Sequence, residues 1–479
     1  MTTTDQTPDA GAAADAHTVD TVIRGVTVLA PTSRPAVGYP EHPADRAAPA
    51  EFLPEHSIAI SGGTIAWIRP DAEVDVEALT AAGAVIHDAP GRVAIPGMIN
   101  THTHSAMTLF RGAAEDVPTA SWFNEYIWPM EVNLTDRDVR IGTQLAVAEM
   151  LLGGVTTFAD HYFSMNEIAR VVDEMGARAL LAETYFSSQG AEGLDRSAAF
   201  AAEWNGKANG RITTALGPHA VYTVDDADLQ RTADVARQIG VRSHIHASET
   251  MFQTESLLAK RGVTPIQVLH DTGMLDAGVV IGHGTGIIED DLRWLTPFAD
   301  RVGIACCSKV YQKHTHSSTP IRMLHDAGIT VGIGTDGCAS HNTMDMFESV
   351  RTMSLVQKDW LRDATWMTSA HALDLLTRQS AATIGREHDL GSLAPGYQAD
   401  IVLIDVRKPH LHPMNDLAAA LVLSVRASDV ETVFVAGRKL VDDGRLTSFD
   451  LAPVMSEITE AMPRLVDRSH GTTIQTYAP

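Results

Sequence analysis

The sequence predicts an α/β protein in which a (β/α)8, TIM-like barrel carries a small β-sandwich domain formed from both chain ends. Between residues 93 and 389, short runs rich in β-branched residues alternate with longer stretches of helical period, which is the expected layout of such a barrel. Strand-like runs also recur outside this region. Of the 479 residues, 44% are apolar, which suffices for a large core.

The predicted small domain combines two segments far apart in the chain, residues 20–92 and 390–450. Each segment contains runs of strand character bounded by turn residues. These runs lie at 21–30, 57–68, 391–405 and 430–441. The second run contains the pair Gly62-Gly63 and predicts a hairpin.

Three further segments surround these parts. Residues 1–19 lack apolar periodicity and are expected to form a disordered tail. The proline-rich residues 31–56 predict a long surface insertion, whose role the sequence leaves open. Residues 451–479 are expected to be a C-terminal extension with a short helical pattern at 454–465.

The barrel is predicted over residues 93–389 and needs eight strands separated by helices. Strands are expected at 93–100, 155–160, 177–183, 212–216, 241–245, 279–282, 302–306 and 329–334. Helices such as 137–152 and 226–239 lie between them, with apolar residues three or four positions apart.

Composition excludes several classes of function. The net charge of −24 argues against non-specific nucleic-acid binding and against docking on anionic membranes, because both need basic surface. No run of about 18 apolar residues predicts a membrane span, and the N-terminus lacks the basic region of a secretory signal. With only three cysteines, a disulfide framework is not expected. The sequence therefore indicates a soluble, cytoplasmic protein.

Metal-binding residue types stand at the ends of the predicted barrel strands, where barrel enzymes place their reacting groups. The first strand is followed by His102 and His104, which project to the same face of an extended chain. The fifth strand leads to His246, the sixth to His283 and the eighth to Asp336. Imidazole and carboxylate are the ligands of a catalytic zinc or ferrous ion.

A lone histidine at a strand end is more often a hydrogen-bonded structural residue than a metal ligand. We interpret His244, His270 and His325 in this way. That reading is weaker for His102 and His104, because two imidazoles on one face would need two buried partners. The joint pattern in strand order favours a metal site.

The order H-x-H, H-x-x-E, His and Asp resembles the amidohydrolase superfamily. Wider stretches resemble its branch of S-adenosylhomocysteine, methylthioadenosine and adenosine deaminases, and the resemblance covers about residues 20–450. They are PGMINTHTHSAMTLFRG (96–112), GVTTFAD (154–160), GPHAVYT (217–223), HIHASET (244–250), GTDGCASHNTMDMF (334–347) and SLAPGYQADIVLID (392–405).

The resemblance implies a role for each matching residue. The metal ligands would be His102, His104, His246 and Asp336. The catalytic groups would be Glu249 as proton shuttle, His283 as the imidazole that holds the attacking hydroxide, and Asp336 as the acceptor of the water proton. The substrate would contact Glu131 through its ribose hydroxyls, His219 near the purine ring, Trp122 on the pocket wall, and Arg196 near an amino-acid carboxylate.

Several positions depart from the family pattern and leave the substrate open. Cys307–Tyr311 reads CSKVY where relatives commonly show Cys-Pro-x-Ser-Asn. Extra imidazoles stand at His161, His314, His316 and His341, either as drift in loops or as altered specificity. Arg196 does not align cleanly with the family's carboxylate anchor, which weakens S-adenosylhomocysteine relative to smaller nucleosides.

Three functional hypotheses follow. The first is hydrolytic deamination of an adenine nucleoside by an enzyme with one divalent metal, zinc in preference to iron, since both metals accept these ligands. The second is an amino- or chloro-hydrolase of another heteroaromatic ring, such as an s-triazine or a pterin. The third is a non-catalytic scaffold, although no expected ligand is missing. Barrel enzymes of this kind usually assemble, so a homo-oligomer is expected.

Overall fold

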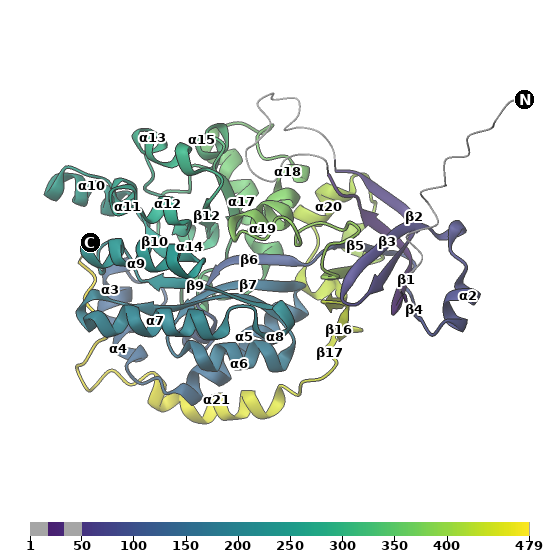
Figure 1. Cartoon of the computed structure of the whole chain (residues 1–479), viewed down its shortest axis with the longest axis horizontal. Helices are drawn as coiled ribbons and strands as arrows, with labels where there is room; N and C mark the ends of the chain where they lie inside the picture. Colours follow the sequence, from purple (N-terminus) through teal and green to yellow (C-terminus); the bar gives the residue numbers. More distant parts are fainter. Residues whose placement is uncertain (1–17, 33–49, 479) are drawn as a thin grey trace, which may run out of the picture.

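The computed structural model describes residues 18–32 and 50–478, which form two adjoining parts (Figure 1). One part is a barrel of strands surrounded by helices, and the other is a smaller sheet at one end of the barrel. The tail predicted over 1–19 lies outside the described residues except for Thr18 and Val19, and most of the insertion predicted over 31–56 also lies outside them.

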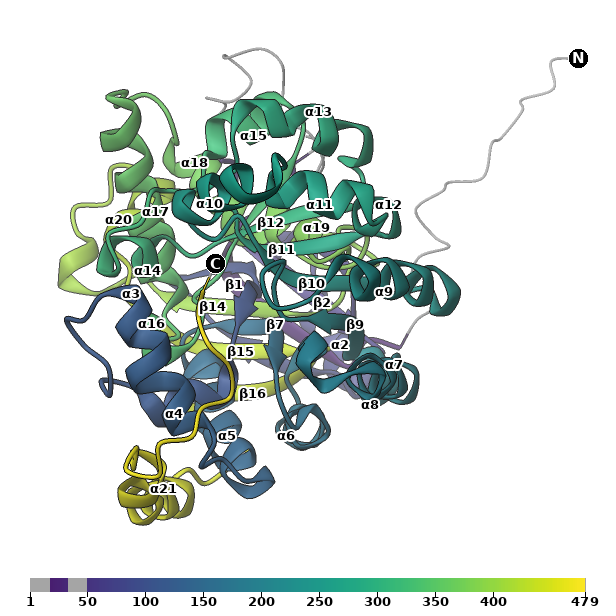
Figure 2. The same cartoon turned by 90° about the vertical axis from the view of Figure 1, so that its left-hand side faces the viewer.

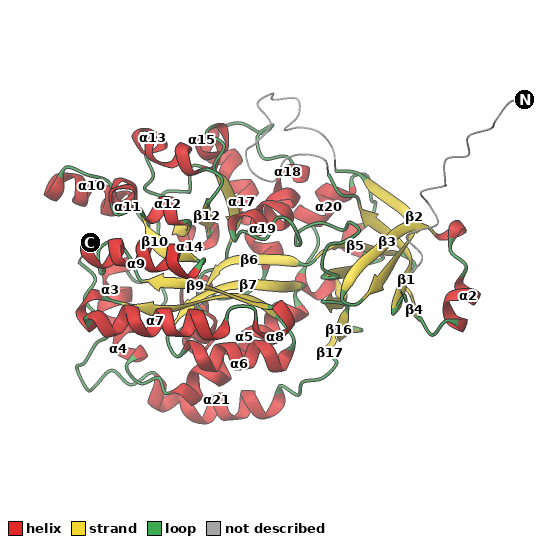
Figure 3. Cartoon of the chain, viewed as in Figure 1, coloured by secondary structure: helices red, strands yellow, loops and turns green. Residues whose placement is uncertain are grey.

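Eight parallel strands follow one another around the barrel and confirm the predicted fold class. Helices cover the outside of these strands (Figure 3). Because both faces of the sheet are covered, strands such as β7 and β8 are buried at every residue. The barrel strands are β6 (Met98–Thr103), β7 (Val155–Tyr162), β8 (Arg178–Tyr185), β9 (Ile212–Pro218), β10 (Arg242–Ala247), β11 (Val279–His283), β12 (Val302–Cys306) and β13 (Thr330–Ile333).

The longer helices begin and end at residues that the sequence marks. Helix α5 starts at a capping box, in which Thr135 accepts from the Asp138 N–H and Asp138 accepts from the Thr135 N–H. Helix α9 ends at Gly240, whose φ of 71° is left-handed. The longer helices are α5 (Asp136–Leu152), α6 (Met165–Met175), α7 (Ala191–Trp204), α9 (Asp226–Ile239), α10 (Met251–Arg261), α17 (Met346–Leu361) and α21 (Ala452–Leu465).

Shorter helices fill the connections. They are α2 (Val76–Ala81), α3 (Thr119–Ser121), α4 (Trp128–Glu131), α8 (Lys207–Gly210), α11 (Pro265–Asp271), α12 (Met274–Ala277), α13 (Leu292–Leu295), α14 (Ser308–Lys313), α15 (Ile321–Asp326), α16 (Cys338–His341), α18 (Ser369–Asp374), α19 (Ser380–Thr383) and α20 (Leu417–Leu423). Within the described residues, no helix combines the length and the apolar character that crossing a membrane requires.

The small sheet is mixed and takes strands from both ends of the chain, as predicted. Strand β14 joins the two contributions, because it pairs antiparallel with β5 on one side and with β15 on the other. All nine strands belong to one continuous sheet, which encloses its own core of residues such as Ile23, Ile58 and Ile401. Its strands are β1 (Thr21–Leu29), β2 (Phe52–Ser61), β3 (Thr64–Pro70), β4 (Val85–Asp88), β5 (Arg92–Pro96), β14 (Ile401–Asp405), β15 (Val430–Val435), β16 (Arg438–Asp442) and β17 (Arg445–Leu446).

Two predicted elements differ in the structure. The single strand predicted over 93–100 is two strands, β5 in the small sheet and β6 in the barrel, with Gly97 between them. A Cβ at Gly97 would lie 2.1 Å from Thr156 Oγ1, so the chain passes there only because the residue is glycine. Strand β2 begins at Phe52, inside the predicted insertion, because Phe52 pairs with Leu29 of β1.

The small sheet and the C-terminal ends of the barrel strands lie at opposite ends of the barrel. Figure 2 looks at the left-hand side of Figure 1, and there the C-terminal segment (yellow) crosses the end of the barrel to its centre. The arrowheads of the barrel strands point to that side (Figure 3). The C-terminal ends of the strands therefore face away from the small sheet.

Candidate active site

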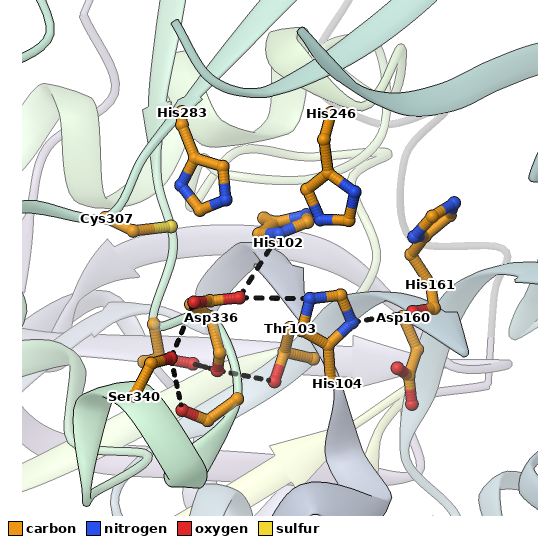
Figure 4. A network of polar contacts seen from close by, with 12 residues as sticks. His102, Thr103, His104, Asp160, His161, His246, His283, Cys307, Asp336 and Ser340 are labelled. Atoms are coloured by element: carbon orange, nitrogen blue, oxygen red, sulfur yellow. Dashed lines mark hydrogen bonds and ion pairs between the residues drawn. The ribbon is translucent and has the colours of Figure 1, made fainter. Parts of the chain in front are cut away.

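Four histidines and one aspartate converge at the C-terminal ends of the barrel strands (Figure 4). These residues form two groups of three, and both groups contain His102. The first group adds His246 and His283, and the second adds His104 and Asp336. Within each group the potential ligand atoms lie within 4.8 Å of one another. Asp336 Oδ1 lies 3.0 Å from His104 Nε2 and 3.4 Å from His102 Nε2. The four predicted ligands therefore lie in one cluster that could bind a metal ion, and the cluster also contains the imidazole of His283.

The backbone holds these residues where the barrel closes. The Asp336 N–H donates to the His102 carbonyl at 2.9 Å, which joins the end of the last strand to the first strand. Asp336 has a φ of 61° and His283 a φ of 73°, although neither is glycine. Left-handed backbone at such residues is strained and concentrates at functional sites.

Hydrogen bonds fix how three of the imidazoles face the cluster. His104 Nδ1 donates to the His161 carbonyl at 2.6 Å, and His246 Nδ1 donates to the His219 carbonyl at 2.7 Å. These bonds leave Nε2 of both rings for a metal. His102 Nδ1 lies 2.8 Å from His244 Nε2, and His102 Nε2 is buried without a hydrogen-bond partner among the described residues.

Except for His104, the charge states of these groups suit a cation. Burial opposes protonation of His104, but its contact with Asp336 raises its pKa to about 9, and a bound cation would displace that proton. Burial lowers the pKa of His283 to about 3 and holds the pKa of His246 well below its ordinary value, so both rings are neutral. Burial opposes ionisation of Asp336, but the nearby imidazoles of His102 and His104 hold its pKa well below the usual range. Neutral imidazole and carboxylate are the forms that bind metal. The orphaned His102 Nε2 and this donor set fit a divalent ion.

Gly282 makes room for the cluster. A Cβ at this position would lie 3.1 Å from His102 Cε1 and 3.2 Å from His246 Cδ2. Both contacts are tighter than ordinary van der Waals separation, so any side chain here would push two ligands apart.

Removing the His244 ring should weaken metal binding. His244 is fully buried and orients His102 through their hydrogen bond, as expected for a structural residue rather than a ligand. We expect His244→Ala to lower metal affinity by about 10–100-fold, which titration with a fluorescent chelator measures. The matched control is His270→Ala, because His270 bonds Asp271 on helix α11, outside the cluster. Equal affinity in both variants would contradict this role.

Glu249 lies beside the cluster in an apolar setting. Gln253 Nε2 donates to Glu249 Oε2 at 2.8 Å, and the Glu249 N–H donates to Gln253 Oε1 at 3.0 Å. The Tyr222 side chain also lies beside Glu249 and acts to lower its pKa. Burial, with a smaller contribution from the charge of Asp336, raises the pKa of Glu249 to about 7. A carboxyl group with this pKa can both give and take a proton near neutral pH.

A cavity opens at the cluster and holds most of the predicted substrate-binding residues. Glu131, His219 and Trp122 line it together with Glu249 and the cluster residues other than His102. Tyr162 donates to Glu131 Oε1 at 2.6 Å. His219 Nδ1 bonds Thr223 at 2.8 Å, which leaves its Nε2 for a ligand. Polar groups that converge between aromatic side chains are typical of a small-molecule site.

Arg196 does not line this cavity. It lies on α7 with its side chain 48% exposed, and Nε lies 3.6 Å from Glu183 Oε1. It lines a separate hollow that shares Phe163 with the main cavity.

The extra histidines divide into two groups. His161 and His314 line the main cavity, and neither ring nitrogen of His161 has a hydrogen-bond partner in the described parts of the chain. His316 bonds Thr119 at 2.9 Å, and the buried His341 bonds Ser349 at 3.1 Å. His325 bonds His371 at 3.2 Å, in line with its structural interpretation.

Sequence reasoning missed the aromatic wall and the residues that hold Glu249. Phe123, Phe186 and Tyr222 line the cavity, and Gln253 holds Glu249. Gln253 stands four positions after Glu249 at the start of α10, and that spacing is the one signal that could have indicated it. The aromatic residues come from separate loops and have no common spacing.

A histidine and aspartate metal site, open to a cavity at the C-terminal end of a barrel, defines a metal-dependent hydrolase. The comparisons agree with this class. A profile of the Amidohydrolase family matches residues 93–440, and the chain belongs to that family.

Relatives extend over most of the chain. A 5-methylthioadenosine/S-adenosylhomocysteine deaminase from Pelotomaculum thermopropionicum is 39% identical over 413 residues, which are 86% of this chain and 94% of the relative. A 5'-deoxyadenosine deaminase from Methanococcoides burtonii is 35% identical over 420 residues, 87% of this chain and 94% of the relative.

Solved structures share the architecture. An adenosine deaminase from Xanthomonas campestris with bound zinc has a TM-score of 0.81 at 28% identity and covers 93% of this chain and 98% of its own. An atrazine chlorohydrolase from Arthrobacter aurescens complexed with zinc has a TM-score of 0.80 at 24% identity, covering 92% of this chain and 100% of its own. The similarity to the chlorohydrolase supports the fold only.

Proposed function

We propose that this protein deaminates adenine nucleosides by hydrolysis, releasing ammonia and forming the inosine analogue. The observation that carries this proposal is the shared cavity, in which Glu249 stands beside the metal cluster and Glu131 and His219 provide polar contacts for a larger substrate. The deaminase names of relatives at 35–39% identity support the same reaction. Adenosine, methylthioadenosine and S-adenosylhomocysteine are the candidate substrates.

The metal would be held by His102, His104, His246 and Asp336, and we propose zinc. Imidazole and carboxylate suit zinc and also ferrous iron, and the zinc-bound adenosine deaminase of the same architecture favours zinc. When bound, such an ion lowers the pKa of water from about 15.7 towards 7 and so supplies hydroxide at neutral pH.

The side chains around the cavity divide the proton transfers. Asp336 takes the proton of the attacking water, and His283 orients that oxygen. Glu249 protonates the ring nitrogen, which makes the carbon bearing the amine electrophilic. As the added hydroxyl group becomes the carbonyl, Glu249 takes its proton and delivers it to the departing amine, and the proton held by Asp336 then restores the acid form of Glu249. The raised pKa of Glu249, about 7, suits both transfers. Burial of these groups excludes water and strengthens their electrostatic effect.

Glu131 would hold the ribose hydroxyls, and its ionisation should set the pH dependence of binding. Burial raises the pKa of Glu131 to about 7. The carboxylate accepts two hydroxyl hydrogen bonds better than the acid does, so inosine should bind more tightly as pH rises through 7. We expect Glu131→Gln to weaken binding by about 10–100-fold, from the loss of about 1.5–3 kcal/mol, and to abolish this pH dependence. Calorimetric titration with inosine at pH 6 and pH 8 measures both effects.

If the affinity of Glu131→Gln for inosine still depends on pH as in wild type, a group other than Glu131 titrates. Unchanged affinity would exclude Glu131 from ribose recognition. The matched control is Glu125→Gln. The Glu125 carboxylate bonds Ser121 at 2.9 Å and does not line the main cavity.

Ammonia release across a substrate panel tests the proposed function. The panel contains adenosine, methylthioadenosine, S-adenosylhomocysteine, an s-triazine and a pterin, with metal-quantified enzyme. We expect release from at least one nucleoside and none from the triazine or pterin. The exposed position of Arg196 outside the cavity favours the smaller nucleosides over S-adenosylhomocysteine. Release from the triazine or pterin alone would contradict the proposal. Light scattering tests the expected homo-oligomer.

A further inference from the structure

We propose that residues 466–478, here termed the C-terminal strap, close the outer wall of the active-site cavity, and that Tyr477 is a positioning residue for Glu249. The strap follows α21 and runs over the C-terminal end of the barrel to its centre (Figure 2). This inference rests on the proposed role of Glu249 in deamination.

The first part of the strap is tied to the segment that leads into α5. Asn133 Nδ2 donates to the carbonyls of Leu465 and Asp467, at 3.1 and 2.7 Å. Arg468 donates to the Glu125 carbonyl at 2.6 Å, and its guanidinium lies 4.2 Å from the centre of the Tyr126 ring. These contacts set the course of the strap along the wall of the cavity.

The end of the strap is fixed by a reciprocal pair of hydrogen bonds. The Tyr477 N–H donates to Asn124 Oδ1 at 2.8 Å, and Asn124 Nδ2 donates to the Tyr477 carbonyl at 3.2 Å. Asn124 belongs to the π-helical turn Trp122–Ile127, an element that occurs frequently at functional sites. Both backbone groups of Tyr477 are therefore satisfied by one side chain, which fixes the residue in place.

The Tyr477 ring packs behind two residues that line the cavity. It stacks on Phe123 with a centroid distance of 4.6 Å and an interplanar angle of 7°, and it meets Tyr222 edge-on at 5.6 Å. Phe123 and Tyr222 come from opposite sides of the barrel mouth and both line the cavity. Tyr477 thus joins them from outside, through a stacked contact and an edge-on contact, both favoured arrangements of aromatic rings.

The same residue reaches the support of Glu249 by two routes. Tyr222, against which Tyr477 packs, lies beside the Glu249 side chain and interacts with it. Gln253, which bonds Glu249 at 2.8 Å, also lies beside the Tyr477 side chain and interacts with it. Losing Tyr477 would loosen both supports and admit water to the outer face of Phe123 and Tyr222. The carboxyl group of Glu249 would then occupy a wider range of positions, and small displacements of a reacting group are costly to turnover.

Three full-length variants test the strap. We expect Tyr477→Ala to lower kcat by about 10–100-fold with KM changed less, because the proton-transferring group and not the metal is displaced. Tyr477→Phe keeps both ring contacts and should recover most of this loss. Thr476→Ala is the matched control, since Thr476 is exposed on the same strap. Metal content and thermal midpoint are measured for each variant.

A readout besides activity separates this inference from the proposed function. Hydrogen exchange of residues 119–128 and 219–224 should be faster in Tyr477→Ala than in wild type and unchanged in Thr476→Ala. Unchanged exchange would contradict the proposal that the strap closes the cavity wall. This outcome does not depend on whether the wild-type protein deaminates a nucleoside. Faster exchange with kcat within twofold of wild type overturns the positioning role. A loss of kcat that parallels a loss of metal or of folded protein does so as well.

Discussion

Replacing Glu249 with glutamine should lower nucleoside turnover by about 10²–10⁴-fold while the protein keeps its metal. Glutamine has the size of glutamate and can still accept the hydrogen bond from Gln253, so the fold is preserved. It cannot give or take a proton near pH 7, whereas the pKa of Glu249 is raised to about 7. Ammonia release per metal-loaded protein measures the effect.

The control for this variant is Glu255→Gln, because Glu255 is exposed on the same helix. It should turn over substrate at the wild-type rate. Wild-type turnover by Glu249→Gln, with any substrate that the wild type converts, would remove Glu249 from the mechanism. Loss of metal in that variant would instead place Glu249 among the ligands.

Asp336→Asn should abolish both metal binding and activity. The substitution removes the negative charge that faces His102 and His104 at 3.4 and 3.0 Å, and it removes the group proposed to accept the water proton. A metal site supplies several kcal/mol of transition-state stabilisation, so we expect kcat/KM to fall by more than about 10³-fold. Elemental analysis and ammonia release are the two measurements.

Chelation offers an independent test of the same site. Wild-type protein stripped of metal should lose activity and regain it when zinc is added, whereas Asp336→Asn should regain none. Asp359→Asn is the matched control. Asp359 is exposed, and its carboxylate accepts a hydrogen bond from Arg362. Stoichiometric metal in Asp336→Asn would exclude Asp336 as a ligand.

The metal cluster could be predicted because its spacing follows from strand geometry. His102 lies in β6, and His104 follows two positions later, directly after the strand. Parallel strands bring His246, His283 and Asp336, three positions after β13, to the same end of the barrel. The eight strands themselves could be predicted, since β-branched runs alternate with helical periods. These signals are local and repeat along the chain.

The rest of the site depends on contacts that no local period encodes. Arg196 lies within the expected segment, yet its side chain turns to Glu183 and away from the main cavity. Tyr477 packs on the outer wall of the cavity because Asn124 and Phe123, more than 340 residues away in the chain, hold it there. The break at Gly97 was missed for a similar reason, because the steric limit comes from Thr156 of a neighbouring strand.

The seam between β5 and β14 has a consequence for biosynthesis. Arg92 of β5 pairs with Asp405 of β14. During translation β5 therefore cannot pair with β14 until more than 300 further residues have been synthesised. At about 5–20 residues per second this delay is roughly 15–60 s. During that time the edge of β5 is an unpaired template, and a nascent chain is open to capture by chaperones or by other edges. Slow translation between these two strands would lengthen the exposure.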